Sequence, residues 1–321
     1  MLLSPLSAAP NKNDIILTHV YIAPYIRRTP VLTSGSLNRL AGAELYFKCE
    51  NFQKIGAFKM RGGASAAVRL TEEERRLGLA THSSGNHAQA IARAAKLLGA
   101  PAYIVMPDNA PRPKIEATLS YGAEIIFCAP TPEDREATLA EVVRKTGATF
   151  IHPYNDWNVI AGQATAAKEL IEDAPVQLDI IIPPVGGGGL LSGTALAARY
   201  FSPSSRTIGA EPQAVDDARR SLQSGTIEKN LSTNTIADGL RTPLGEKTFA
   251  IIRQEVEDIL TVDEEAIIEA MRLIYERLKI VIEPSCALPL AVVLANPPRF
   301  HNKKIGLILT GGNIDLNKLP F

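Results

Sequence analysis

The feature that most constrains this chain is the alternation of short runs rich in β-branched residues with longer segments of helical periodicity. Runs with the length and composition of strands occupy 45–49, 102–106, 124–128, 149–152, 179–185, 207–211, 259–262 and 305–310. Helical segments between them occupy 86–98, 132–145, 161–171, 263–278 and 284–295. This alternation is typical of proteins in which helices join parallel strands. We therefore predict an α/β fold.

Three of the predicted strands are spaced evenly in the middle of the chain. They begin at Ala102, Glu124 and Thr149, and a helical segment follows each of them. Such a repeat forms a compact unit of its own. We predict a small domain at 80–157, inserted into a large domain built from 1–79 and 158–321.

Composition narrows the class of partner. The 34 basic residues balance 34 acidic ones, so the chain has no long-range field to attract nucleic acid or an anionic membrane, and a small molecule is the expected partner. Cys49, Cys128 and Cys286 form no closely spaced pair, which disfavours disulfides and zinc sites and agrees with a cytoplasmic protein. The N-terminus lacks the basic region of a signal peptide.

An uncharged stretch at 180–198 is long enough to span a bilayer, but Pro183, Pro184 and four glycines interrupt it. We predict a buried strand, a loop and a helix that starts at Leu190. The loop consists of Gly186, Gly187, Gly188 and Gly189. Its backbone N–H groups and the positive end of the helix favour a bound phosphate.

Lys59 stands in the segment GAFKMRGG, between a predicted strand and a helix. Apolar neighbours and a positive helix end both lower the pKa of an ammonium group and free its amine. Most lysines are surface residues, so Lys59 alone carries little weight. Combined with a phosphate loop, it suggests a cofactor that has both an aldehyde and a phosphate.

The segment HSSGNHAQ at 82–89 places several small polar side chains where a helix begins. One such residue suffices to cap a helix. Capping alone therefore does not explain the excess of polar groups at this helix N-terminus.

The chain resembles the fold type II pyridoxal-phosphate enzymes of the serine racemase and serine/threonine dehydratase family. GAFKMRGG is similar to the family's Schiff-base lysine motif, SSGNHAQA to its substrate and cofactor loop, GGGG to its phosphate cradle, and TGGN at 310–313 to the segment below the pyridine nitrogen. The resemblance covers nearly the whole chain. It implies the tryptophan synthase β-like fold, with two open, twisted, mostly parallel sheets flanked by helices and a small domain that closes over the substrate.

The resemblance also implies roles for individual residues. Lys59 binds pyridoxal phosphate covalently and moves the Cα proton. The other implied cofactor contacts are Phe58, Asn86 at the ring 3-oxygen, the four glycines Gly186, Gly187, Gly188 and Gly189, Gly239, and Thr310. The implied substrate contacts are Ser83, Ser84, Asn86 and His87 around the carboxylate, together with Tyr154 and Asn155.

Two residues bear on the reaction type. A hydroxyl at Thr310 leaves the pyridine nitrogen largely neutral, which weakens the electron sink and suits β-elimination. Ser84 stands where the family's racemases and 3-hydroxyaspartate dehydratases carry serine and its pure threonine dehydratases usually carry alanine. A hydroxyl on the face opposite Lys59 supplies the second proton donor that inversion requires.

A divalent-cation site is a further implication of the resemblance. The carboxylates of Glu211 and Asp217 and the carbonyl of Val215 are similar to the cation ligands of serine racemases, and oxygen ligands suit Mg²⁺, Ca²⁺ or Mn²⁺. From the residues alone, Asp216 and Asp217 are better explained as acids in the first turn of a helix.

The leading hypothesis is a serine racemase with serine and threonine dehydratase activity, working as a homodimer. The nearest alternatives are a threo-3-hydroxyaspartate dehydratase and a threonine dehydratase without racemase activity. A nucleotide-dependent dehydrogenase would use the glycine loop but leaves Lys59 and Thr310 without a function. A ligand-binding protein without catalysis on the same fold is the remaining alternative.

Overall fold

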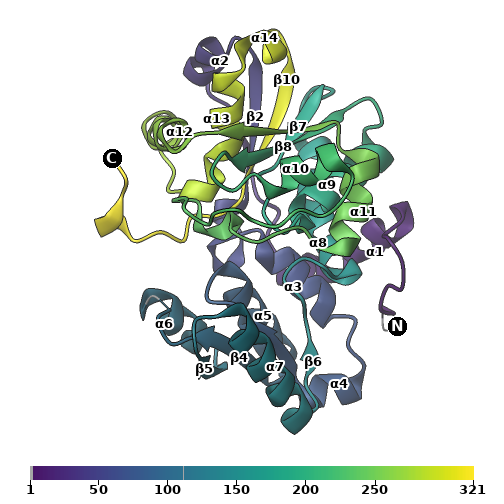
Figure 1. Ribbon diagram of the computed structural model, residues 1–321. Helices are drawn as coiled ribbons and strands as arrows, with labels where there is room; N and C mark the ends of the chain where they lie inside the picture. Colours follow the sequence, from purple (N-terminus) through teal and green to yellow (C-terminus); the bar gives the residue numbers. More distant parts are fainter. Residues whose placement is uncertain (1–2, 111) are drawn as a thin grey trace.

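The computed structural model describes residues 3–110 and 112–321, and its strands form two separate sheets (Figure 1). The six-stranded sheet has the order β1-β2-β10-β7-β8-β9. Its strands are β1 (Val31–Leu32), β2 (Glu44–Cys49), β7 (Ile180–Ile182), β8 (Arg206–Pro212), β9 (Asp258–Val262) and β10 (Lys304–Leu309). All neighbouring pairs are parallel except β1 and β2.

The four-stranded sheet is wholly parallel and has the order β5-β4-β3-β6. Its strands are β3 (Leu79–His82), β4 (Ala102–Pro107), β5 (Glu124–Cys128) and β6 (Thr149–Phe150). They come from one continuous stretch, whereas the larger sheet uses strands before and after it. The α/β fold with two mostly parallel sheets is confirmed; the domain boundaries at 80 and 157 stay a prediction.

Helices cover the faces of both sheets (Figure 1). They are α1 (Lys12–Ile22), α2 (Gly35–Ala41), α3 (Lys59–Ala67), α4 (Glu72–Leu77), α5 (Asn86–Leu98), α6 (Arg112–Ser120), α7 (Pro132–Thr146), α8 (Trp157–Asp173), α9 (Gly189–Phe201), α10 (Asp217–Ser224), α11 (Glu246–Glu255), α12 (Glu264–Leu278), α13 (Leu288–Ala295) and α14 (Pro297–Phe300). Short 3₁₀ helices are η1 (Ala23–Tyr25), η2 (Glu50–Phe52), η3 (Lys54–Gly56), η4 (Asp238–Leu240), η5 (Pro284–Cys286) and η6 (Leu316–Lys318). No helix within the described ranges has the length and apolarity to cross a membrane.

Local chemistry explains where elements depart from their predicted ranges. The strand predicted at 179–185 ends at Ile182, because Pro183 and Pro184 have no N–H for the ladder. Helix α8 begins earlier than predicted, since the Asp156 carboxylate accepts hydrogen bonds from the N–H groups of Asn158 and Val159. The helix predicted at 284–295 is divided into η5 and α13.

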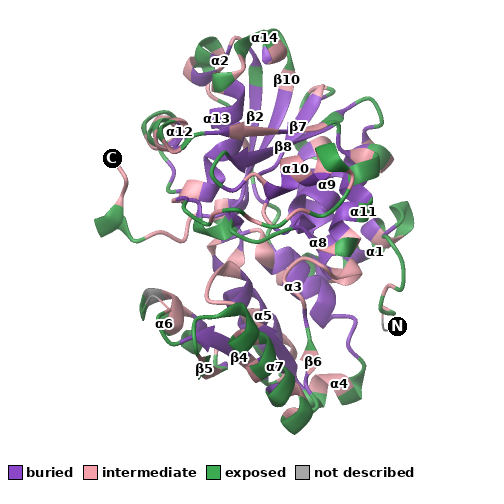
Figure 2. Cartoon of the chain, in the orientation of Figure 1, coloured by how far each residue is buried: buried purple, intermediate pink, exposed green. Residues whose placement is uncertain are grey.

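The buried interior brings the two sheets together through α3, α5 and α8. Helix α3 packs extensively on both α5, which covers the smaller sheet, and α8, which packs on α9. Buried residues fill most of β2, β7, β8 and β10 in the larger sheet, while α6 and α7 present exposed residues on the outside of the smaller one (Figure 2). The carboxyl ends of β3, β7 and β10 lead directly into the segments that carry the predicted site residues. Ligands of open α/β sheets bind at this edge.

Candidate active site

Lys59 is the first residue of α3. The two residues before it, Ala57 and Phe58, pair with the backbone that follows β10. Ala57 forms an isolated antiparallel bridge with Gly311, and the Phe58 N–H donates to the Thr310 carbonyl at 2.9 Å. The Lys59 Nζ donates to the Pro153 carbonyl at 3.0 Å and lies 5.2 Å from the centre of the Phe58 ring. The structure therefore places the predicted Lys59, Phe58 and Thr310 side by side.

The setting of Lys59 weakens its hold on a proton. The residue is half-buried, and the surrounding protein desolvates the ammonium group and lowers its pKa to about 8. The nearby Glu283 carboxylate opposes this effect. A pKa of about 8 leaves an appreciable fraction of neutral amine near neutral pH, as a nucleophile or a base requires.

Asn86 is held at the start of α5 by two residues from the C-terminal part of the chain. Its Nδ2 donates to both carboxylate oxygens of Glu283, at 2.9 and 3.1 Å. Its Oδ1 accepts a 2.8 Å hydrogen bond from the Asn313 Nδ2, which also donates to the Ile55 carbonyl. Asn313 thereby links Asn86 to the segment that precedes Lys59 and to the segment that follows Thr310.

Glu283 is a site residue that the sequence analysis missed. Its burial raises the pKa of the carboxyl group to about 7, and the hydrogen bond from Asn86 only partly offsets this. Its N–H donates to the Gly311 carbonyl at 2.9 Å, so it lies at the same strand end as Thr310. The only sequence signal was one carboxylate after the apolar pair Val281 and Ile282.

The glycine loop joins β7 to α9 in a conformation that excludes larger residues. Gly188 has a φ of +88°, and a Cβ there would lie 2.8 Å from Thr248. A Cβ on Gly187 would lie 2.3 Å from the Tyr154 ring, and one on Gly186 would lie 3.0 Å from the Leu240 Cα. Close packing by Tyr154 and Thr248 thus accounts for part of the glycine requirement.

The same loop presents free backbone donors. Within the described ranges, the N–H groups of Gly186, Gly187 and Gly188 donate to no other group. Gly189 begins α9, whose first turn adds the positive end of the helix dipole. The loop therefore has the donor chemistry of a phosphate site.

Gly239 and Thr310 complete the predicted cofactor contacts. A Cβ on Gly186 would lie 3.2 Å from the Gly239 carbonyl oxygen, so Gly239 borders the glycine loop. Among the described residues, the partner of the Gly239 N–H is the Ser285 hydroxyl, at a distance of 3.3 Å. The Thr310 hydroxyl is buried and has no hydrogen-bond partner of regular geometry among the described residues, with the Cys286 thiol as its neighbour. A buried hydroxyl without a partner is costly unless a ligand satisfies it.

The predicted substrate contacts lie around the start of α5. Ser83 Oγ accepts from the Gly85 N–H at 3.2 Å. Ser84 is half-buried, and its hydroxyl makes no hydrogen bond with any described residue. His87 is buried, its Nε2 contacts the Ile151 carbonyl at 3.2 Å, and its Nδ1 has no partner in the described part of the chain. Burial, aided by the charge of Lys59, keeps the pKa of His87 well below its ordinary value, so the ring is neutral.

The segment from His152 to Asn155 closes the side of the site next to the glycine loop. His152 Nδ1 accepts from the N–H groups of Tyr154, at 3.3 Å, and Asn155, at 2.9 Å. Burial lowers the pKa of His152 to about 4, which keeps this acceptor unprotonated. Asn155 Oδ1 is occupied by the Lys247 N–H at 2.8 Å. Asn155 therefore braces the start of α11, and its predicted substrate contact stays a prediction.

The three residues predicted to bind a cation lie between the end of β8 and the start of α10. Glu211 accepts from the N–H groups of Ala218 and Arg219, at 2.9 and 3.0 Å. Burial raises the pKa of Glu211 to about 9 and that of Asp217 to about 7, and each rise is increased by neighbouring carboxylates. The Oδ2 of Asp217 has no partner among the described residues. Val215, which lies between Glu211 and Asp217 in the sequence, is buried. No cluster of three or more metal-ligating side chains occurs within the described ranges.

Three features of the site fit pyridoxal phosphate. Lys59 offers an amine with a lowered pKa for the aldehyde, the N–H groups of the glycine loop are free for the phosphate, and the Thr310 hydroxyl lacks a partner among the described residues. Phe58 and Thr310 adjoin Lys59, and Gly239 adjoins the glycine loop. The arrangement can bind an aldehyde, hold a phosphate and move a proton at one carbon.

Comparisons with known proteins agree with this chemistry. The sequence profile of the family described as "Pyridoxal-phosphate dependent enzyme" matches residues 22–311. The chain is 48% identical over 312 residues to a beta-hydroxyaspartate dehydratase of Paracoccus denitrificans, covering 97% of this chain and 99% of that protein. It is 49% identical over 306 residues to a serine racemase of Arabidopsis thaliana, covering 94% and 92%. The structure of maize serine racemase superposes with a TM-score of 0.94 at 46% identity, covering 96% and 95%.

Proposed function

The chain belongs to the pyridoxal-phosphate-dependent enzymes, in the racemase and ammonia-lyase family, and on that premise we propose that it is a serine racemase with dehydratase activity. It interconverts L-serine and D-serine, and converts L-serine to pyruvate and ammonia. L-Threonine gives 2-oxobutanoate in the same way. The observation that carries the proposal is Lys59, an amine with a pKa lowered to about 8, beside a Thr310 hydroxyl that no described residue satisfies.

Each site residue has a role in this reaction. Pyridoxal phosphate, when bound, supplies an aldehyde for the amine and a ring that takes up electrons released at Cα. Lys59 removes the Cα proton from one face, and Ser84 returns a proton from the other face to give D-serine. When the hydroxyl of serine departs instead, elimination follows. Thr310 donates a hydrogen bond and leaves the ring nitrogen neutral, which favours that departure.

The substrate carboxylate is proposed to bind at the N-terminus of α5. The hydroxyls of Ser83 and Ser84 stand at this end, where the helix dipole favours an anion. Helix α5 has no side-chain cap of its own, so its first N–H groups are available to a ligand. His87 is neutral and buried behind them.

A threo-3-hydroxyaspartate dehydratase is the second candidate. The Paracoccus denitrificans relative carries that kind of activity in its name and covers nearly the whole chain. 3-Hydroxyaspartate differs from serine by a distal carboxylate. A basic group near the substrate side chain would therefore favour the dehydratase of 3-hydroxyaspartate over the serine racemase. A threonine dehydratase without racemase activity is the third candidate, and a threonine deaminase of known structure is 45% identical to this chain.

We also propose a divalent cation at Glu211, Asp217 and the Val215 carbonyl. Two buried carboxylates with raised pKa values, one with an oxygen that no described residue satisfies, are the arrangement that a cation stabilises. We also propose a homodimer, which follows from the resemblance alone, and a cytoplasmic location, which follows from the three widely separated cysteines.

The deciding experiment measures two products in one reaction. The protein is loaded with pyridoxal phosphate, supplied with L-serine and either magnesium or a chelator, and assayed for D-serine by chiral separation and for pyruvate by a coupled assay. We expect both products, with D-serine lost and pyruvate retained in Ser84→Ala. Pyruvate without D-serine in the unaltered protein would reject the racemase, and a much faster reaction with threo-3-hydroxyaspartate would favour the second candidate.

A further inference from the structure

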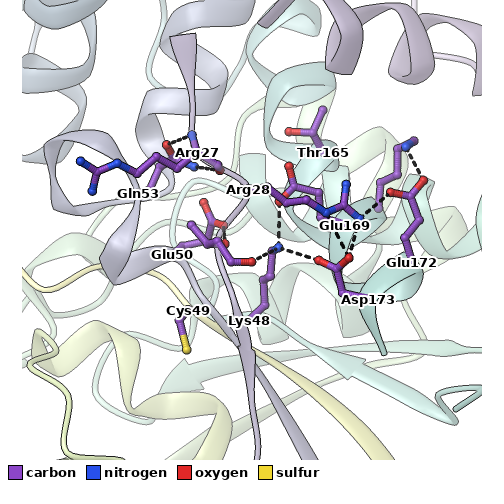
Figure 3. Close-up of polar contacts among 12 residues, drawn as sticks. Arg27, Arg28, Lys48, Cys49, Glu50, Gln53, Thr165, Glu169, Glu172 and Asp173 are labelled. Atoms are coloured by element: carbon purple, nitrogen blue, oxygen red, sulfur yellow. Dashed lines mark hydrogen bonds and ion pairs between the residues drawn. The ribbon is translucent and has the colours of Figure 1, made fainter. Parts of the chain in front are cut away.

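A cluster of fully buried charges lies between β2, α3 and α8. Its members are Lys48, Glu50, Arg61 and Glu169, each with a relative exposure of 0%. Two positive and two negative groups make the cluster neutral. Figure 3 shows part of it, with Lys48 between Glu169 and Asp173. None of these residues has a role in the chemistry described above.

Arg61 occupies the centre of the cluster and uses every donor of its guanidinium group. It forms one fork with Glu50, through Nε at 2.7 Å and Nη2 at 2.8 Å. It forms a second fork with Glu169, through Nη1 at 2.9 Å and Nη2 at 2.7 Å. Nη1 also donates to the Thr165 hydroxyl and Nη2 to the Arg27 carbonyl.

The two carboxylates are themselves held in place. Glu50 accepts from the Thr29 hydroxyl at 2.5 Å. Glu169 accepts from the Lys48 ammonium at 2.8 Å and contacts the His19 ring nitrogen at 2.9 Å. These partners belong to α1, β2 and the segment before β1. Arg61 therefore joins α3 to parts of the fold that cannot rotate with it.

The cluster acts on the same helical turn that carries Lys59. Successive residues of an α-helix are about 100° apart around its axis, so Lys59 and Arg61 point in nearly opposite directions. The start of α3 has no side-chain cap of its own. Behind it the backbones of α3 and α8 touch, since a Cβ on Gly162 would lie 2.4 Å from the Arg61 carbonyl oxygen. The forks of Arg61 thus fix the rotation of a turn that is otherwise uncapped.

Stability alone does not account for such a cluster. Well-packed apolar residues of similar volume often stabilise a protein as well as a buried ion pair does. A doubly forked guanidinium supplies direction in addition to attraction, because its planar donors accept only one orientation of each carboxylate. Direction is what Lys59 needs, since a shift of about 1 Å at a reacting group costs about 100-fold in rate.

We propose that Arg61 is a positioning residue for Lys59, holding the first turn of α3 so that the amine faces the cofactor site. The inference rests on the proposed role of Lys59 as the cofactor-binding lysine. It concerns the geometry of that lysine and not the choice of substrate. An arginine is required, because lysine keeps the charge but has no planar fork.

The test compares Arg61→Lys with Arg69→Lys in protein reconstituted with pyridoxal phosphate. Arg69 is a matched control: it lies just beyond the end of α3, is buried, and donates hydrogen bonds to Ser65 and Thr18. Three readouts are taken: the melting temperature, the cofactor dissociation constant, and the pH at which the visible band of the lysine-bound cofactor titrates. We expect about ten-fold weaker cofactor binding and a displaced titration in Arg61→Lys. Arg69→Lys should lose stability and keep both cofactor readouts.

The outcomes separate this inference from the proposed function. If Arg61→Lys loses stability but binds and titrates the cofactor like the unaltered protein, or if both variants shift the readouts equally, Arg61 is only structural. Should Arg61→Lys not fold, Thr165→Val removes one acceptor of the guanidinium and must displace the titration in the same direction. Lys59→Ala is the reference, since retention of the lysine-bound band in that variant would reject the role of Lys59 itself.

Discussion

Glu283 is a buried acid whose ionisation opposes folding, and this gives a pH dependence that can be measured. Its pKa is about 7 in the folded protein against an ordinary 4.5. Below pH 4.5 both states are protonated, and as the pH rises to 7 only the unfolded chain releases the proton. The folded state therefore loses stability over this window, by on the order of 3 kcal/mol at roughly 1.4 kcal/mol per pKa unit. Glu283→Gln removes this loss and keeps an oxygen to accept from Asn86.

The measurement is urea unfolding of the cofactor-free protein at pH 5 and at pH 8. We expect the unfolding free energy of Glu283→Gln, relative to that of the unaltered protein, to be higher at pH 8 than at pH 5. Glu269→Gln, which changes an exposed carboxylate on α12, is the control and should show no such gain. An equal pH dependence in the Glu283 variant and the unaltered protein would show that this carboxyl ionises normally in the fold.

The loop between β7 and α9 is shaped by its contact with Tyr154 as well as by its proposed phosphate. A Cβ on Gly187 would overlap the Tyr154 ring at 2.3 Å, so Gly187→Ala must displace the ring or the loop. Overpacking of this kind costs about 1–3 kcal/mol. We expect Gly187→Ala to lower the unfolding free energy by that amount and to weaken the binding of pyridoxal phosphate.

A double variant distinguishes overlap from a general loss of structure. Tyr154→Ala in the Gly187→Ala background removes the obstructing ring, and the double variant should be more stable than the sum of the single effects predicts. Unfolding free energies of the four proteins measure this coupling. Additive effects would mean that the loop and Tyr154 do not restrict each other.

The whole molecule shows which part of the fold the sequence could predict. Helix α5 and strand β5 match their predicted ranges, because hydrophobic periodicity and glycine end signals are local. The contact between Asn86 and Glu283 joins residues 197 positions apart, and no local pattern encodes it. The overlap of Tyr154 with Gly187 and the forks of Arg61 are equally non-local. Motifs thus predicted the family, while the residues that hold the motifs in register required the fold.

The predicted inserted domain has a consequence for the motions of the whole chain. Strand β5 at the edge of the smaller sheet has no fully buried residue, and α7 is exposed along much of its length, whereas β7 and β10 of the larger sheet are mostly buried. Segments with fewer buried contacts open at lower free energy. We expect hydrogen–deuterium exchange of the cofactor-loaded protein to show residues 80–157 opening together and faster than the rest.

Adding a substrate analogue with a carboxylate should slow exchange at 83–87, because a bound anion would tie the start of α5 to the cofactor. Exchange that is uniform across both sheets, or unchanged at 83–87, would contradict a small domain that closes over the substrate.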